Sequence, residues 1–534
     1  MKKIISILIA VSAVITLLSS CSEKPSDTAT EAADTAKGSD TAENVTTDDV
    51  TESETEPETE PETEPEFNVV NDPDATLTVP RTFGSHMVLQ RDSVINVFGY
   101  SNRDGAVVRG TLGDSTAFST VDDGKFELHF KPRPASSDPV TLLIEDDRGN
   151  SVSFDDVLIG DVWIIGGQSN AQVQLSFIRA GLSSVPEFDE NDGVRLLMQS
   201  ADYYVAHPDS VKEPLTDLGD PSCRWKRQNS AAATEFSALG LFFARHLYKE
   251  NGVPVGMICT AANGAQIQEL MAKEAAYKCK LKSSLKVGPG GFFNGMMNPL
   301  IGISFKGLVF FQGESESIMS STSSKFDEYV KAYTDDLRER TGIDFPLFMV
   351  QLSSYTNASL SNFPYVYETR TKQLEASETI ANCTLITSYD LGSPAGYSDP
   401  LHSPRKQELG ERIADAVLAV VYGKGDTDAV LPPVPVSYTK TDDGKAYDVK
   451  FEHVGGGLVS LGENGVAGFA FGNKSKKTAA EATVISPDTV RVTIPENVKT
   501  SYISYGYENV LTEENAGLYS GTGIPAAAFN TKIN

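Results

Sequence analysis

From Val157 to Gly425 the chain alternates short apolar runs with longer amphipathic segments, and this alternation constrains the fold more than any other feature. The short runs are typical of strands buried on both faces, and the longer segments have the period of helices. The runs are DVWIIG, VPVGMICTA, KGLVFFQG, FPLFMVQLS and CTLITS, and the helical segments are EFSALGLFFARHLYKENG, FDEYVKAYTDDLRERTG and RKQELGERIADAVLAVVYG. This alternation predicts an α/β domain with a parallel sheet over residues 158–425.

The segments on either side of this domain consist of short alternating runs broken by Gly, Asp and Asn. VINVFGY, GAVVRGTL, KFELHF and VTLLIED precede it, and YDVKFEHV, VAGFAFG, TVRVTIP and YISYGY follow it. Alternation with a period of two residues predicts strands, so we expect β-sandwich-like modules at residues 68–157 and 426–534.

The first twenty residues have the composition of a signal peptide, with Lys2 and Lys3 followed by an apolar run. The run ends in LSSC, which resembles a bacterial lipobox. The resemblance implies cleavage before Cys21, lipid on its thiol, and an exported lipoprotein anchored to the outer side of a bacterial membrane. We expect no other membrane contact, because the apolar run is short for a transmembrane helix and an acidic tract follows it.

Residues 21–67 are predicted to form a disordered tether rich in Thr, Glu and Pro. Residues 22–66 contain 16 acidic residues and two lysines, about half of the chain's formal net charge of −28. A self-repelling segment interrupted by proline stays extended. The acidic balance of the remaining chain argues against nucleic acid as a partner.

Four cysteines follow Cys21 along the chain. None belongs to a C-x-x-C pair or lies beside histidines at the spacing of metal ligands, so no zinc site and no cofactor are predicted. A disulfide between two of them is compatible with an exported protein, but the sequence does not determine the pair. The four are Cys223, Cys259, Cys279 and Cys383.

The first predicted strand of the α/β domain ends in the turn GGQSN, which presents Ser169. In a parallel α/β sheet, ligands bind outside the carboxyl ends of the strands, so this serine is well placed for chemistry. A serine becomes a nucleophile when a histidine takes its proton and a carboxylate orients that histidine. A structural turn is the alternative interpretation of Gly-Gly-Gln-Ser-Asn.

One of the six histidines, His402, lies just before the last predicted helix. Ser403 is expected as the N-cap of that helix and Pro404 as its first residue. Asp399, three residues before the histidine, is placed to orient the imidazole. Asp390, in SYDLGSP at another strand end, is an alternative acid.

A tetrahedral oxyanion also needs hydrogen-bond donors, and three predicted strand ends offer them. The first is the backbone amide of Ser169. The second is Gly264 in TAANGAQ, where the missing side chain allows the backbone to approach a substrate. The third is the side-chain NH2 of Gln312 in FFQGESES.

Several segments resemble the sialate O-acetylesterase family, a branch of the SGNH hydrolases, over a stretch from about residue 74 to the end. The segments include SHMVLQRD (85–92), DVLIGDVWIIGGQSN (156–170), KGLVFFQGESES (306–317) and RKQELGERIA (405–414). The resemblance implies a flavodoxin-like hydrolase domain that removes acetyl groups from sugars without a metal, with an O-acetylated glycan as its partner. It implies that Ser169, His402 and Asp399 are catalytic, that Ser169, Gly264 and Gln312 bind the oxyanion, and that Gln168, Asn170 and Glu314 support the site.

The chain departs from the family pattern close to these motifs. Ala171 stands where Met is usual, Asn263 where Gly is usual, and Glu316 where Asn or Asp is usual. The loop between Gln168 and Trp225 and the segment VGPGGFFNGMM are expected to shape the sugar pocket. Phe292 and Phe293 are candidates for stacking on a sugar ring, with core packing as the alternative.

Two other functions remain open at this point. One is a glycan-binding surface protein that has lost activity, and the other is an esterase of the same class that acts on non-sugar esters. The sequence determines neither the acetylated sugar nor the oligomeric state.

Overall fold

The computed structural model describes residues 65–178, 191–281, 286–355, 362–462, 465–473, 476–498 and 501–533. The predicted signal peptide, the predicted lipidation site at Cys21 and nearly all of the predicted tether lie outside the described residues. Within the described ranges, no helix is long and apolar enough to cross a membrane.

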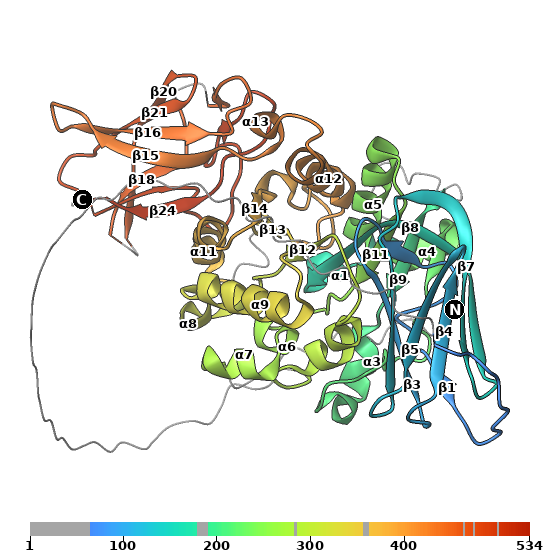
Figure 1. The fold of residues 1–534 in the computed structure, drawn as a ribbon. Helices are drawn as coiled ribbons and strands as arrows, with labels where there is room; N and C mark the ends of the chain where they lie inside the picture. Colours follow the sequence, from blue (N-terminus) through green and yellow to red (C-terminus); the bar gives the residue numbers. More distant parts are fainter. Residues whose placement is uncertain are drawn as a thin grey trace, which may run out of the picture. The chain divides into compact units, whose positions relative to one another are not determined.

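The prediction of an α/β domain is confirmed by a sheet whose central strands are parallel (Figure 1). Their order is β9 (Asn191–Met198), β11 (Val255–Cys259), β8 (Ser151–Gly167), β12 (Gly307–Phe311), β13 (Leu347–Val350) and β14 (Cys383–Ile386). β10 (Lys226–Gln228) pairs antiparallel with β9 at the edge. Because β8 lies between the later strands β11 and β12, the strand order reverses there, and such a switch point is where open α/β sheets bind ligands.

Helices cover both faces of this sheet. α5 (Ala238–Asn251) and α12 (Lys406–Tyr422) pack against each other on one face, and α9 (Phe326–Thr341) lies on the other. Successive residues of β8 alternate between these two cores: Trp163 contributes to the core with α5 and α12, and Ile164 to the core with α9. The stretch 162–165 of β8 is therefore apolar without interruption, because both faces of the strand are buried there.

The start of the last helix of the domain was predicted incorrectly. α12 begins at Lys406, and its N-cap position, Arg405, makes no side-chain cap. The Ser403 hydroxyl instead accepts a hydrogen bond from the Arg405 amide, at 3.2 Å, in the turn before the helix. Ser403 and Pro404 therefore belong to the loop that carries His402.

The sequence analysis did not predict α11 (Val366–Thr379). The buried face of this helix includes Thr369, Arg370 and Gln373, so its apolar period is obscured. The Arg370 guanidinium donates hydrogen bonds to the carbonyls of Leu352 and Ser353, which compensates for its burial.

The N-terminal module is built of strands, as expected, but it is continuous with the central sheet. β8 has 17 residues and runs through the predicted boundary between residues 157 and 158. Its first half pairs with β7 (Ser136–Asp146) and β2 (Val88–Gln90), and β7 continues through β4 (Val107–Leu112) to β5 (Ser115–Thr120). A separate sheet contains β1 (Leu77–Thr78), β3 (Ile95–Ser101) and β6 (Lys125–Phe130).

The C-terminal module contains two four-stranded sheets. One has the order β15 (Val434–Lys440), β16 (Ala446–Glu452), β21 (Thr489–Thr493) and β20 (Ala482–Ser486). The other has the order β19 (Lys477–Ala479), β18 (Phe469–Gly472), β22 (Tyr502–Tyr505) and β24 (Phe529–Lys532), and β17 (Val459–Ser460) pairs with β23 (Leu518–Tyr519).

Buried hydrogen bonds join the C-terminal module to the end of the α/β sheet. Gln351, directly after β13, donates to the carbonyl of Ala528 and accepts from its amide, at 3.2 and 3.1 Å. Thr387, directly after β14, donates to the carbonyl of Pro525 at 2.9 Å.

The remaining α-helices of the described residues are short: α1 (Ser169–Gln172), α2 (Leu175–Ile178), α3 (Ala201–Ala206), α4 (Ser230–Glu235), α6 (Ile267–Leu270), α7 (Lys273–Lys278), α8 (Ser320–Ser323) and α13 (Thr427–Val430).

Candidate active site

Ser169 lies at the carboxyl end of β8, where it begins the one-turn helix α1. Gly167, two residues earlier, has a φ of +120°, and a Cβ there would lie 2.1 Å from the carbonyl oxygen of Phe311 on β12. Only glycine allows this strand ending beside β12. Because the first amides of a helix have no acceptor within the helix, the Ser169 N–H is directed away from the body of α1.

His402 and Asp399 form a hydrogen-bonded pair in the loop before α12. His402 Nδ1 lies 2.8 Å from Asp399 Oδ2, and the other carboxylate oxygen accepts from the backbone amides of Leu401 and His402. Burial would raise the pKa of Asp399, but the bonds from the His402 ring and these amides outweigh it and lower the pKa to about 2. With Nδ1 donating to this carboxylate, Nε2 is the nitrogen that can accept a proton.

The alternative acid, Asp390, is bound elsewhere. The Arg412 guanidinium of α12 donates to both of its carboxylate oxygens, at 2.8 and 2.6 Å. Of the two candidates, Asp399 is therefore the carboxylate that orients His402.

Ser169 and His402 line one small cavity of about 250 Å³. The structure does not contain a hydrogen bond between them: His402 Nε2 is buried and has no hydrogen-bond partner among the described residues. Serine and imidazole thus share the cavity without a hydrogen bond to each other; in catalytic sites without substrate such bonds are often long.

Residues that the sequence analysis did not single out complete the cavity wall. The exposed ring of Phe177 meets the His402 ring edge-on, with centroids 6.0 Å apart and an interplanar angle of 90°. The other lining residues are Gln172, Val173, Gln174, Asp202 and Asn263. All but Asn263 lie between Gln168 and Trp225, as predicted for the pocket, but this segment is not a single loop, because it contains α1, α2, β9 and α3. Part of it is outside the described residues.

Of the two interpretations of Phe292 and Phe293, core packing is confirmed and sugar stacking is excluded. Their exposed fractions are 1% and 2%, so no ligand can reach either ring, and both pack in the core. The segment VGPGGFFNGMM does not contribute to the catalytic cavity.

Gly264 occupies the turn after β11 with a φ of +63°, a left-handed conformation that favours glycine. Asn263 is not in that region, so its replacement of the usual glycine does not strain the turn. Asn263 lines the cavity, and a Cβ at Gly264 would lie 3.5 Å from Lys286 Nζ.

Gln312 does not present a free NH2 group to the cavity, which corrects the prediction of an oxyanion donor. Its side-chain nitrogen lies 3.0 Å from Gln168 Oε1, 3.0 Å from the carbonyl of Ala265 and 2.9 Å from Glu316 Oε2. The two hydrogens of this NH2 group are already directed at three acceptors, so they cannot also bind an oxyanion. Gln312 instead connects the loops that follow β8, β11 and β12.

A buried polar network joins three segments of the site, namely α1, the loop after β12 and the start of α12. Asn170 donates to Glu314 Oε1 at 2.6 Å and accepts from Lys406 Nζ at 2.7 Å. Tyr355 also donates to Glu314, at 2.8 Å. Burial raises the pKa of Glu314 and lowers that of Lys406 to about 8. The network ties α1, which begins with Ser169, to α12, which follows the His402 loop.

The buried carboxyl group of Glu316 is expected to make the free energy of unfolding depend on pH. Burial raises its pKa to about 7 from an ordinary value of 4.5. Between these pH values the folded state holds more protons than the unfolded state, so the free energy of unfolding falls as the pH rises. Glu316→Gln is expected to make that decline shallower, as urea titrations at several pH values across the interval would measure. The same slope in parent and variant would contradict the assignment.

The matched control for this prediction is Glu328→Gln on α9. The Glu328 side chain is 65% exposed, and we expect its replacement to leave the pH profile unchanged.

The cysteines are not candidates for the nucleophile. Cys223, Cys259, Cys279 and Cys383 are free thiols, and burial raises the pKa of Cys259 and Cys383 to about 12. In the part of the chain that the structure describes, no group of three or more His, Cys, Asp or Glu side chains is arranged to hold a metal ion.

Comparison with known proteins places this site within a recognised domain. Residues 159–419 match the family model described as carbohydrate esterase, sialic acid-specific acetylesterase. The chain is 26% identical over 295 residues to a sialate O-acetylesterase of Pongo abelii, and 25% identical over 295 residues to one of Homo sapiens. Each alignment covers 50% of this chain and 55% of the relative, so the chain spans about half the length of these curated relatives.

A solved structure extends the similarity to the flanking modules. It is that of a carbohydrate acetylesterase from Xanthomonas citri, with a TM-score of 0.70 and 24% sequence identity. The superposition covers 85% of this chain and 99% of that chain. At this identity the likeness establishes a shared fold.

Proposed function

We propose that this chain, whose residues 159–419 belong to the family of sialic acid-specific carbohydrate acetylesterases, is a serine hydrolase that removes O-acetyl groups from carbohydrates. The observation that carries the proposal is the 2.8 Å hydrogen bond from His402 Nδ1 to Asp399 Oδ2, beside a cavity that His402 shares with Ser169. In this arrangement the chain supplies a nucleophile, a base and the acid that orients the base.

The catalytic cycle follows from these three side chains. Ser169 Oγ attacks the acetyl carbonyl carbon while His402 Nε2 accepts the hydroxyl proton, and Asp399 stabilises the resulting imidazolium. The tetrahedral intermediate then expels the sugar oxygen, which takes the proton from His402. Water attacks acetyl-Ser169 with His402 as base, and acetate leaves.

The backbone amides of Ser169 and Gly264 are the oxyanion donors in this proposal. Backbone donors fixed before reaction stabilise the developing charge without reorganisation. Gln312 and Glu316 act as positioning residues, because they hold the loops on which these amides lie.

We further propose that the protein is exported and anchored by lipid at Cys21. The sequence LSSC after the apolar run supports this location, and palmitate labelling that is lost in Cys21→Ser would test it. The flanking β modules and the family of the central domain favour glycans over lipids or thioesters as substrates.

A panel of esters tests the proposed reaction. We expect the purified full chain to release acetate from an aryl acetate and from acetylated xylan or O-acetylated sialic acid, and to hydrolyse an aryl butyrate at least tenfold more slowly. Discrimination in an acyl pocket is worth about 1–3 kcal/mol for each extra methylene, and butyrate has two more than acetate. Equal rates on acetate and butyrate, with none on either glycan, would favour an esterase of non-sugar substrates.

A further inference from the structure

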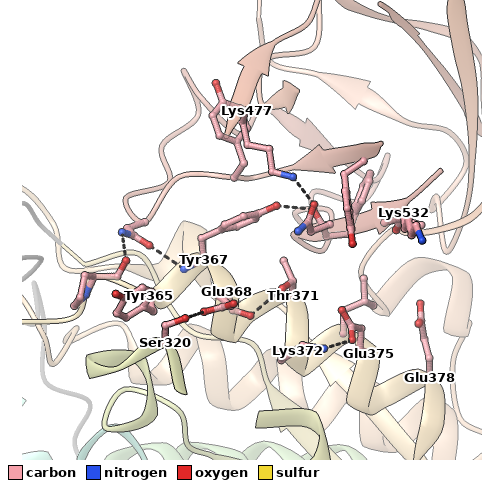
Figure 2. Close-up of a pocket in the computed structure, with 18 residues that line it drawn as sticks. Ser320, Tyr365, Tyr367, Glu368, Thr371, Lys372, Glu375, Glu378, Lys477 and Lys532 are labelled. Atoms are coloured by element: carbon pink, nitrogen blue, oxygen red, sulfur yellow. Dashed lines mark hydrogen bonds and ion pairs between the residues drawn. The ribbon is translucent and has the colours of Figure 1, made fainter. Parts of the chain in front are cut away.

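A groove of about 1080 Å³ lies between α11 and the C-terminal module (Figure 2). It shares no lining residue with the catalytic cavity. One wall is a stripe along α11 formed by Tyr367, Thr371, Glu375 and Glu378, whose spacing of three or four residues puts them on one face of the helix. The opposite wall consists of strand residues of the module, namely Lys477, Tyr502, Asn530 and Lys532.

Hydrogen bonds across the groove fix its two walls relative to each other. The Tyr367 amide donates to Asn509 Oδ1 at 2.9 Å, and the Tyr367 hydroxyl donates to the carbonyl of Phe529 at 3.3 Å. On the strand side, Lys477 Nζ donates to Asn530 Oδ1 and lies 5.2 Å from the centroid of the Tyr502 ring. The groove is therefore preorganised, which reduces the cost of ordering a ligand.

Aromatic side chains line this groove at several points along its length. Tyr365 is 37% exposed at the start of α11, and Tyr502 and Tyr507 lie on the module side. The face of an aromatic ring carries partial negative charge, so the polarised C–H groups on the flat face of a sugar pack favourably against it.

The charges of the lining balance each other. The lining contains three carboxylates, of Glu368, Glu375 and Glu378, and three ammonium groups, of Lys372, Lys477 and Lys532. A polyanion would meet as many like charges as opposite ones. Carboxylate, amide and ammonium groups together match a ligand whose many hydroxyls both donate and accept hydrogen bonds.

The groove also continues along the boundary of the module. Leu374 and Glu378 line both this groove and a second cavity of about 420 Å³ beside β14 and β15. Glu378 is exposed in the groove, and its carboxylate makes no hydrogen bond with the described residues. An elongated site of this size accommodates several sugar units, whereas the catalytic cavity of about 250 Å³ does not.

We infer that this groove binds a neutral oligosaccharide, at a site separate from the catalytic cavity and between α11 and β24. The site would hold the carbohydrate chain of a polymeric substrate, so the role suggested for it rests on the proposed function. The binding of an oligosaccharide to the groove does not rest on the proposed function, because a chain without acetyl groups is a ligand for the groove alone.

Calorimetric titration of the full chain with six-residue xylo-, gluco- and manno-oligosaccharides, all without acetyl groups, tests the inference. We expect at least one of them to bind, and Tyr365→Ala to weaken that binding by roughly tenfold. The hydrogen bonds of Tyr365 come from its backbone, which alanine retains, so the variant is expected to fold. Tyr277→Ala on α7, where Tyr277 is 46% exposed and outside the groove, is the matched control with unchanged binding.

Glu378→Gln is a second variant that keeps the shape of the side chain and is expected to weaken binding several-fold. Three results would overturn the inference. The first is that none of the three oligosaccharides binds, and the second is that the Tyr365 variant binds as tightly as the parent. The third is that hexagalacturonate binds more tightly than every neutral chain. Hydrolysis of an aryl acetate by Tyr365→Ala should equal that of the parent, so a failure of the groove is distinguishable from a failure of the catalytic proposal.

Discussion

Replacement of Ser169 by alanine is expected to reduce kcat for an aryl acetate by about 10⁴- to 10⁶-fold, since the acetyl group then has no side chain to which it can transfer. The cavity is retained, so KM should change little. The measurement is acetate release by parent and variant at equal concentration, over a time long enough to detect the slow residual reaction.

The control is Ser210→Ala in the loop after α3, where the serine hydroxyl donates to the carbonyl of His207 and does not line the catalytic cavity. Its activity should equal that of the parent. Full activity in Ser169→Ala, in protein that unfolds at the parent's temperature, would show that the nucleophile is another residue.

The second large effect is expected from Asp399→Asn, with kcat reduced about 10⁴-fold. An amide in place of the carboxylate would donate toward His402 Nδ1 and favour the tautomer whose Nε2 carries hydrogen. That tautomer cannot accept the proton of Ser169. Steady-state kinetics on an aryl acetate, with the pH varied, measure the loss.

Asp390→Asn is the matched control because the two aspartates were the alternative acids and only one of them contacts His402. Asp390 is held by Arg412, so its replacement is expected to lower the unfolding temperature and to leave kcat of the folded protein within a few-fold of the parent. A larger kcat loss in Asp390→Asn than in Asp399→Asn would reverse the assignment.

The parts of the fold that could be predicted from the sequence are those in which burial follows the chain's own period. β8 is apolar on both faces from Val162 to Ile165, and α5 and α12 have apolar stripes on their buried faces, so the existence and type of these elements were predictable. α11 has polar residues on its buried face, among them Arg370, which is stabilised by carbonyls far away in the sequence. No local pattern indicates such a face.

In the candidate site too, contacts between residues close in sequence were predictable and contacts between distant segments were not. Asp399 and His402 are three residues apart, and short spacing was enough to predict their contact. The function of Lys406 and Tyr355 could not be predicted, because each is defined by a partner from another segment, Asn170 and Glu314 respectively.

Gln312 shows a further limit of prediction from sequence. Its position at the end of β12 was predictable, but the direction of its NH2 group depends on acceptors from two other loops, at Gln168 and Ala265, and on Glu316 in its own loop. The domain boundary at residues 157 and 158 failed for a related reason, since one long strand continues from the N-terminal module into the α/β domain while its patterning changes along its length.

The most direct test of the account is to identify the residue that is acetylated during turnover of an O-acetylated glycan. The full chain is mixed with excess substrate, quenched in acid within the first turnovers, digested and examined by peptide mass spectrometry. The account predicts one acetyl group on the peptide that contains Ser169, absent from Ser169→Ala and from a reaction with the deacetylated glycan. Two results would contradict Ser169 as the nucleophile. One is acetate release from the glycan with the acetyl group on a different residue. The other is acetate release with no acetylated peptide, together with full activity in Ser169→Ala.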